Sequence, residues 1–126
     1  MIIKMTNKDE NFYKYMGRCF GSRLIEKQTN DRIYDDDDKK WYLYIEEEKV
    51  MAFVSINKNV IRNIYTTREK YLEEIFMEIK NEEHITYSVV TNYYLDVYKK
   101  CGFKVFEKNE YRNFLTIYMD KEEALV

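Results

Sequence analysis

The chain has 126 residues and a formal net charge of −2, and 45% of its residues are hydrophobic and 17% aromatic. This composition excludes a disordered chain, and the length predicts a single domain, residues 1–126, with a core of its own. The near balance of charge excludes a field that would draw the protein onto nucleic acid or an anionic membrane, so neither is expected as a partner.

The location follows from what the sequence lacks. It contains no apolar run of about 18 residues, the length that a membrane span needs, and it does not open with a signal-peptide pattern. The two cysteines, Cys19 and Cys101, are too few for a disulfide framework. We therefore expect a cytoplasmic protein with reduced thiols.

The chain begins with a predicted strand and a long amphipathic segment. Met1–Met5 is a short apolar run typical of a strand. From Lys8 to about Gln28, apolar residues recur at helical spacing, which predicts a helix interrupted near Gly17 or Gly21. Polar residues before this segment can cap the helix.

An acidic loop is predicted next. Residues 29–40 are polar and include four consecutive aspartates, Asp35–Asp38. Adjacent carboxylates on an extended chain repel one another and do not converge easily on one ion. The run therefore predicts a solvated loop in preference to a cation site, and no metal is expected.

Three strands in meander order follow the loop. They are predicted at Trp41–Ile45, Val50–Ile56 and Val60–Tyr65, separated by short charged or polar turns. Connections this short make neighbouring strands antiparallel.

The second half of the chain alternates helix and strand. Thr66 and Glu69 have the spacing of a capping box, and the apolar stripe behind them predicts a helix that ends near Asn81. Four more elements complete the chain: a buried strand at Ile85–Val90, a helix from Thr91 or Asn92 through Cys101, and strands at Phe103–Glu107 and Tyr111–Met119. Gly102 stands where a helix C-terminus favours a left-handed residue, and a turn is predicted at residues 108–110.

These elements define the expected fold class. The order is β-α-β-β-β-α-β-α-β-β, an α/β (α+β) domain with one mixed, mostly antiparallel sheet of six or seven strands and helices on its faces. The passage from Val60 through a helix to Val90 predicts one parallel crossover within the sheet.

Two segments carry a resemblance to a known family. Val50–Ile56 follows an acidic hairpin turn, and the segment from Tyr98 to Phe103 has the pattern Tyr-x-x-x-Gly-Phe. In this order of elements, the chain resembles the GCN5-related N-acetyltransferase (GNAT) family. The resemblance implies a GNAT fold and an acyl-CoA-dependent transfer of an acetyl group to an amine of a small molecule or protein.

The resemblance also implies a cofactor site. Acetyl-CoA would bind at the end of the Val60–Tyr65 strand and the start of the next helix, through Ile64, Tyr65, Thr66, Arg68 and Lys70. Family members hold the diphosphate with a glycine-containing loop at a helix N-terminus. Here residues 66–72 contain no glycine, with Lys70 and Leu72 in the glycine positions, so the motif is degenerate.

The catalytic residues implied by the resemblance are incomplete. Tyr98 matches the general acid that protonates the departing CoA thiolate, although it also belongs to a helical apolar stripe that would place it in the core. Asn92 matches an asparagine that precedes this helix and is expected to contact the cofactor. No general base is evident, because the fourth strand offers only Arg62 and Asn63. The single histidine, His84, is interpreted as a loop residue.

A second hypothesis is a catalytically inactive protein on the same fold. It would act by binding a host protein, for example as a phage or mobile-element factor, and it is motivated by the missing glycines, the missing base and the 13 tyrosines. The enzyme hypothesis predicts CoA binding, whereas the binding-protein hypothesis predicts an exposed aromatic patch. An edge strand such as Tyr111–Met119 is a further candidate for pairing with another chain.

Overall fold

The computed structural model describes residues 1–29, 33, 35–36, 38–82, 87–91, 95–109 and 114–119, of which 87–91, 95, 103–109 and 114–119 are described by their backbone alone. Its elements, in chain order, are β1 (Ile2–Met5), α1 (Phe12–Met16), α2 (Arg23–Thr29), β2 (Lys40–Glu46), β3 (Lys49–Asn57), β4 (Val60–Thr66), α3 (Glu69–Glu82), β5 (Tyr87–Thr91), α4 (Leu95–Lys100), β6 (Phe103–Asn109) and β7 (Phe114–Met119).

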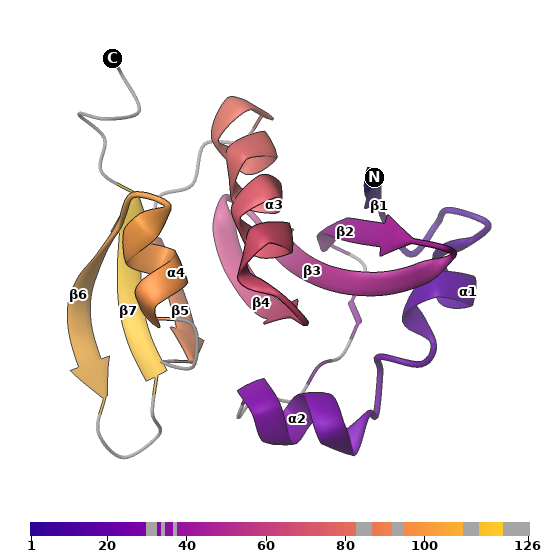
Figure 1. Ribbon diagram of the computed structural model, residues 1–126, viewed down its shortest axis with the longest axis horizontal. Coiled ribbons are helices and arrows are strands. Elements are labelled where there is room, and N and C mark those ends of the chain that lie inside the picture. The colour runs from indigo at the N-terminus through magenta and orange to yellow at the C-terminus, as the bar shows by residue number, and fades with distance from the viewer. Residues whose placement is uncertain are drawn as a thin grey trace.

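The strands of the described residues form one seven-stranded sheet in the order β1-β2-β3-β4-β5-β7-β6 (Figure 1). All neighbouring strands pair antiparallel except β4 and β5, which pair parallel. The helix α3 makes the crossover between these two strands, as parallel neighbours require. The predicted fold class, a mixed and mostly antiparallel sheet with helices on its faces, is confirmed.

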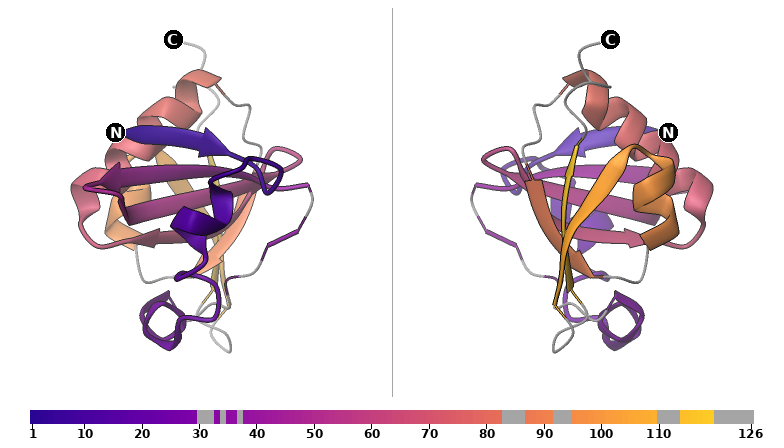
Figure 2. Two further views of the ribbon diagram at one scale, coloured as in Figure 1. Left: turned by 90° about the vertical axis from the view of Figure 1, so that its right-hand side faces the viewer. Right: turned by 90° about the vertical axis from the view of Figure 1, so that its left-hand side faces the viewer.

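Helices cover both faces of the sheet (Figure 2). Side chains alternate across a strand, so successive residues of β2, β3 and β4 enter two separate cores. One core packs against α3 and α4 and contains Tyr42, Val54, Ile64, Leu72, Ile75, Phe76, Ile79 and Tyr98 among others. The other packs against α1 and α2 and contains Phe12, Met16, Trp41, Leu43, Phe53 and Tyr65 among others.

Both hairpins of the β2–β3–β4 meander use two-residue turns without glycine. Glu47 and Glu48 have φ of 48° and 64°, and Lys58 and Asn59 have φ of 50° and 66°. This is the backbone pattern of type I′ turns, which match the twist of the strands but strain residues that carry a Cβ. A chain with three glycines therefore accepts local strain at these turns to keep its register.

The first helical segment is interrupted as predicted: it forms two helices, α1 and α2, and the chain turns between them at Gly21, whose φ is +77°. Two later features differ from the sequence prediction. β6 continues through Asn109, so Lys108 and Asn109 lie in a strand and not in the predicted turn. β7 lies between β5 and β6, so the suggestion that Tyr111–Met119 is an edge strand was wrong, and β6 forms that edge.

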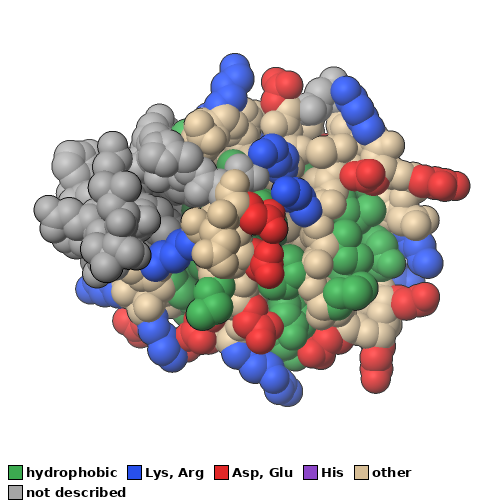
Figure 3. All heavy atoms as spheres, turned by 90° about the horizontal axis from the view of Figure 1, so that it is seen from above, with side chains coloured by type: hydrophobic (Ala, Val, Ile, Leu, Met, Phe, Trp, Pro, Cys, Tyr) green, Lys and Arg blue, Asp and Glu red, His purple; other side chains and the backbone are tan. Residues whose placement is uncertain are grey.

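On the face shown in Figure 3, acidic and basic side chains are interspersed among apolar ones, in keeping with the net charge of −2. None of the described helices is long and apolar enough to cross a membrane.

The packing of α3 leads to a stability prediction. Leu72 is fully buried under the sheet, whereas Met77 on the same helix is 68% exposed. Leu72→Ala should lower the free energy of unfolding by about 2–5 kcal/mol, because it leaves a cavity. Met77→Ala should change it by less than about 0.5 kcal/mol. Urea unfolding followed by circular dichroism measures both, and equal losses would contradict the assignment of the buried face.

Candidate functional site

The parallel contact between β4 and β5 is short. Among the described residues, the two strands pair only at Val60–Tyr87 and Ile61–Ser88, although β4 continues to Thr66 and β5 to Thr91. Beyond this contact the two parts of the sheet, β1–β4 and β5–β7, turn away from each other (Figure 1). The second half of β4 therefore has β3 on one side and a diverging strand on the other.

The register of β3 and β4 shows which backbone groups face this divergence. The N–H of Thr67 donates to the carbonyl of Met51 at 2.9 Å, which continues the β3–β4 ladder past Thr66. In an antiparallel ladder, hydrogen-bonded pairs alternate with pairs that are not bonded. Asn63 and Tyr65 therefore direct their backbone groups toward β3, whereas Ile64 and Thr66 direct theirs toward β5.

The turn into α3 differs from the predicted capping box. The Thr66 hydroxyl accepts a hydrogen bond from the N–H of Arg68 at 3.2 Å and donates one to the Arg68 carbonyl. The helix itself begins at Glu69. The Thr66–Glu69 capping box was therefore wrong, because Thr66 bonds two residues ahead and closes a tighter turn before the helix.

Two basic side chains stand at this helix start. Arg68 and Lys70 are both exposed, with Glu69 between them. The Lys70 ammonium lies 5.2 Å from the centre of the Tyr71 ring, a distance that permits a cation–π contact. The partial positive charge of the helix N-terminus adds to these two cations.

Aromatic residues fix the first turn of α3 to the sheet. The Tyr71 hydroxyl donates to Glu46 Oε2 at 3.0 Å, and the Tyr71 ring packs on Tyr44 with centroids 4.5 Å apart. Burial, together with the hydrogen bond to Glu46, raises the pKa of Tyr71. A hydrogen bond to Glu74 is the main cause of the raised pKa of Tyr44. Both phenols thus stay protonated at neutral pH and hold the helix start in place.

A polar network is buried on the opposite face of the sheet, under α1 and α2. The Lys39 side chain is 3% exposed, and its Nζ donates to Asn63 Oδ1 at 3.0 Å. The Ser55 hydroxyl donates to the same oxygen at 2.7 Å. Lys39 Nζ also lies 3.6 Å from Asp36 Oδ2.

This network follows one row across three strands. Trp41 pairs with Ser55, and Ser55 pairs with Asn63, so all three side chains project from the same face. Trp41 is fully buried, and the Lys39 ammonium lies 5.6 Å from the centre of its ring. Asn63 is two residues past Ile61, where the described pairing of β4 with β5 ends. The row therefore ends beside the divergence of the two strands.

Tyr98 lies in the core on the α3 and α4 face. It is fully buried, and its ring is 6.4 Å from that of Phe76. It shares a core cluster with Ile64, whose backbone faces the β4–β5 divergence. The helix α4 ends at Lys100, and Gly102, two residues further on, has a φ of +91°, the left-handed conformation that the sequence predicted there.

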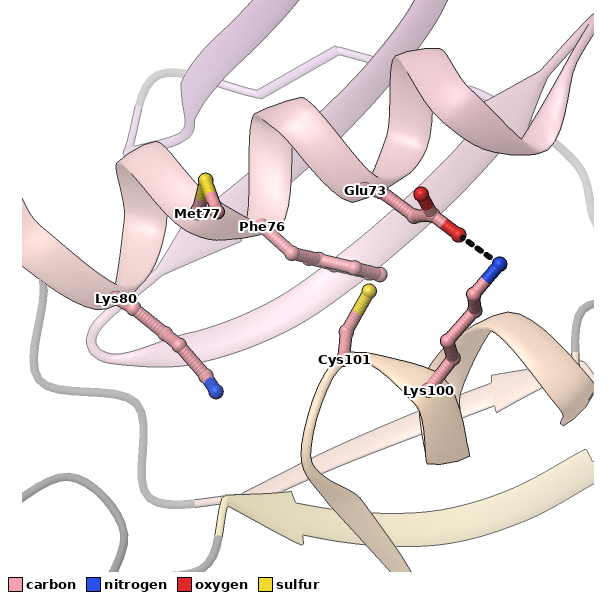
Figure 4. Close-up of a pocket in the computed structure, with 6 residues that line it drawn as sticks. All are labelled: Glu73, Phe76, Met77, Lys80, Lys100 and Cys101. Carbon is pink, nitrogen blue, oxygen red and sulfur yellow. Dashed lines mark ion pairs between the residues drawn. The ribbon is translucent and has the colours of Figure 1, made fainter.

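A hollow of about 280 Å³ lies between α3 and α4, lined by Glu73, Phe76, Met77, Lys80, Lys100 and Cys101 (Figure 4). Lys100 and Glu73 form an ion pair of 3.0 Å at its rim. Burial raises the pKa of the Cys101 thiol to about 11, and that of Cys19 likewise to about 11. Both thiols are therefore protonated at neutral pH, which excludes a ready thiolate nucleophile.

One aspartate of the predicted acidic loop, Asp35, contacts the first helical segment, and Asp37 lies outside the described residues. Asp35 Oδ2 accepts hydrogen bonds from Tyr13 Oη at 2.8 Å and from Asn7 Nδ2 at 3.2 Å. The expectation that all four aspartates remain in solvent was therefore wrong for Asp35, while Asp36 and Asp38 are exposed as expected. The described residues contain no group of three or more His, Cys, Asp or Glu side chains placed to hold a metal ion.

The structure brings some predicted site residues together and leaves others apart. Ile64, Tyr65 and Thr66 are buried at the end of β4, and Arg68 and Lys70 are exposed just beyond it. The Tyr65 side chain lies on the α1 and α2 face, whereas that of Ile64 lies on the α3 and α4 face. Asn92 and His84 lie outside the described residues.

Lys39 was not predicted to be buried. It falls in the predicted polar loop, residues 29–40, two residues before the predicted strand Trp41–Ile45. The alternating apolar pattern from Trp41 onward could have identified it, because residue 39 has the same parity as Trp41 and therefore faces the same core.

Comparison with known proteins identifies the fold. No protein-family model matches the chain, and no curated protein matches it. Solved structures of GNAT acetyltransferases do match along nearly its whole length, so the chain has the GNAT fold, as the resemblance implied.

Three of these structures illustrate the likeness. The Escherichia coli protein ElaA superposes with a TM-score of 0.70 at 10% identity, covering 95% of this chain and 99% of ElaA. The Campylobacter jejuni N-acetyltransferase PseH, solved with acetyl coenzyme A, has a TM-score of 0.56 at 13% identity and covers 96% and 99%. A Bacillus subtilis acetyltransferase in complex with CoA has a TM-score of 0.55 at 12% identity and covers 94% and 97%.

The buried network leads to a second prediction. Asn63→Ala should lower the free energy of unfolding by about 1–3 kcal/mol, since it removes the acceptor shared by Lys39 and Ser55. The effects of Asn63→Ala and Ser55→Ala should be non-additive, because the two side chains share one hydrogen bond. Urea unfolding of the single and double variants measures this coupling. Strict additivity would contradict the network.

Proposed function

We propose that the protein is an acyl-CoA-dependent N-acetyltransferase that transfers an acetyl group from acetyl-CoA to the amine of a small molecule or protein. The observation that supports this most directly is the short β4–β5 contact, which leaves the backbone of Ile64 and Thr66 facing a diverging strand. In a GNAT fold, the pantetheine arm of CoA would bind between two strands that diverge in this way.

The residues present fit this cofactor in two respects. The β4 edge offers the backbone groups of Ile64 and Thr66 to an extended amide chain, as a neighbouring strand would. The start of α3 offers Arg68 and Lys70, and both are exposed. Charge-assisted hydrogen bonds from such side chains are a strong means of holding a diphosphate.

The fit differs from a glycine loop in one respect. The N–H groups of Thr67 and Arg68 already donate to Met51 and Thr66. In a glycine loop, backbone N–H groups at this position would point toward the phosphates. Here these two N–H groups form hydrogen bonds within the protein instead. We infer that phosphate binding here depends on side-chain charge, so that it is weaker and more sensitive to salt.

The chain's residues take separate parts in the proposed reaction. When bound, acetyl-CoA supplies an acetyl group activated as a thioester. Tyr98 would donate its phenolic proton to the departing sulfur, and its fully buried position keeps that proton from bulk water. Asn92, which precedes α4 in the chain, would also contact the cofactor. The acceptor amine would approach from the α1 and α2 face, where Lys39 and Asn63 lie.

Calorimetric titration with acetyl-CoA tests the cofactor site. Wild-type protein should bind with micromolar affinity, and Arg68→Ala or Lys70→Ala should each weaken binding about tenfold, the loss of one charge-assisted bond. Lys58→Ala, at the opposite end of β4, is the matched control and should bind normally. No heat and no thermal shift at millimolar acetyl-CoA would refute this proposal in favour of a non-catalytic binding protein.

Tyr98→Phe tests the proposed acid. It should lower kcat by about 100-fold or more, the usual contribution of a general acid. KM for acetyl-CoA should change little, because the phenyl ring keeps the packing against Phe76. Thiol release in an acceptor screen measures both constants. An unchanged kcat would assign Tyr98 to the core alone.

A further inference from the structure

We propose that the hollow between α3 and α4 is a binding site for a small molecule that has one carboxylate group and a compact apolar body. The residues that line the hollow belong neither to the proposed cofactor site nor to the buried network around Lys39. The proposal therefore goes beyond the acetyltransferase activity, and binding at this site can be measured without acetyl-CoA.

The hollow has room for a small ligand. Its volume is about 280 Å³, just below the range of about 300–1,000 Å³ that is usual for pockets of drug-sized molecules. One wall is a single face of α3, because its four lining residues recur at helical spacing. The other wall is the end of α4 (Figure 4). The lining residues are Glu73, Phe76, Met77 and Lys80 of α3, with Lys100 and Cys101.

The floor of the hollow is apolar. Phe76 is fully buried in the core of the α3 and α4 face, and Cys101 is partly buried against the same core. Burial raises the pKa of the Cys101 thiol to about 11, so it offers a neutral, polarisable sulfur at neutral pH. The exposed Met77 adds a flexible thioether, which adapts its shape to apolar ligands. These three side chains can contact the apolar body of a ligand without presenting a charge to it.

The charges around this floor sum to one positive charge. Lys100 Nζ lies 3.0 Å from Glu73 Oε1, so these two side chains neutralise each other. Lys80 is exposed and forms no hydrogen bond or ion pair among the described residues. Figure 4 shows the Glu73–Lys100 pair and Lys80 on opposite sides of Phe76 and Cys101. The hollow therefore offers one unpaired cation beside an apolar surface.

This charge count selects the class of ligand. A carboxylate carries one negative charge at neutral pH, which matches the one unpaired cation, Lys80. A phosphate monoester carries about 1.5 to 2 negative charges, and its second charge would meet only Lys100, which is already paired with Glu73. A cationic ligand would be repelled by Lys80 and would find Glu73 already engaged. A monocarboxylate with an apolar body satisfies both the floor and the charge.

The position of the hollow separates its ligand from the acetyl acceptor. None of the residues that line it is Tyr98 or belongs to the proposed acetyl-CoA site at the end of β4. The floor residue Phe76 nevertheless has its ring centre 6.4 Å from that of Tyr98. A ligand on Phe76 would thus lie one side chain away from the proposed acid, outside the reaction centre.

NMR of the methionine methyl groups tests the site, because Met77 stands at its edge. The probes are benzoate, benzamide and benzamidinium, which share one shape and differ in charge, and acetate, which lacks the ring. The Met77 signal, identified with Met77→Leu, should shift and saturate with benzoate. Benzoate should bind about fivefold more tightly than benzamide, between the effect of an exposed ion pair and that of a bond to a charged group. Benzamidinium and acetate should bind more weakly than benzoate, and the signal of Met16, fully buried in the other core, should stay in place.

Matched variants separate the site from general charge. Lys80→Gln should remove the preference for benzoate over benzamide, because it removes the unpaired cation. Lys99→Gln makes the same change of charge at an exposed lysine of α4 that is not among the described lining residues, and it should retain the preference. Both side chains are exposed, so neither variant opens a cavity in the core.

Equal affinity for benzoate and benzamide, or no saturable shift of the Met77 signal with any probe at tens of millimolar, would overturn the site. Loss of the preference in Lys99→Gln as well as in Lys80→Gln would assign it to overall charge and would also overturn the site. Each of these outcomes is independent of acetyl-CoA binding, which calorimetry measures separately.

Discussion

The arrangement of the molecule depends on the early end of the β4–β5 ladder. β4 is bonded to β3 along its length and beyond, to Thr67, yet among the described residues it pairs with β5 only through Val60 and Ile61. A backbone edge inside a sheet needs hydrogen-bond partners. A divergence at this point is therefore a place where an extended ligand can complete the sheet. The helices α3 and α4 pack on one face of the sheet, and α1 and α2 pack on the other.

The two faces of β4 carry different groups of side chains. On one face, Ile64 packs in the same core as Tyr98, under α3 and α4. On the other, Asn63 holds Lys39 beside Trp41, under α1 and α2. Alternation of side chains along one strand thus places a proposed proton donor and a buried polar network on opposite sides of the same edge. The Tyr71–Glu46 bond adds the third fixed point, because it holds the start of α3, with Arg68 and Lys70, against β2.

Local sequence patterns predicted the turns and helix ends that depend on the conformation of a single backbone position. Gly21 and Gly102 mark a turn and a helix end, and both have positive φ as a glycine permits. The order of strands and helices, together with the segments Val50–Ile56 and Tyr98–Phe103, was sufficient to predict the GNAT fold. Asn92 and the extent of the domain remain predictions, because no observation tests them.

Features that depend on register could not be predicted from the sequence. The Trp41–Ser55–Asn63 row exists only because three strands pair in one particular alignment. Lys39 is buried because it reaches this row, although four aspartates precede it in the sequence. Thr66 had the spacing of a capping box, yet the continued β3–β4 ladder at Thr67 delays the helix to Glu69. Long-range pairing decided each of these outcomes.

Backbone amide exchange along β4 tests the account most directly. With acetyl-CoA bound, the N–H groups of Ile64 and Thr66 should exchange more slowly, because the ligand would pair with that edge. Those of Asn63 and Tyr65 should change little, since they already face β3. Residue-resolved exchange measured by NMR, with and without acetyl-CoA, gives this alternation. Unchanged rates at Ile64 and Thr66, or uniform slowing at all four residues, would contradict a ligand that completes the sheet at β4.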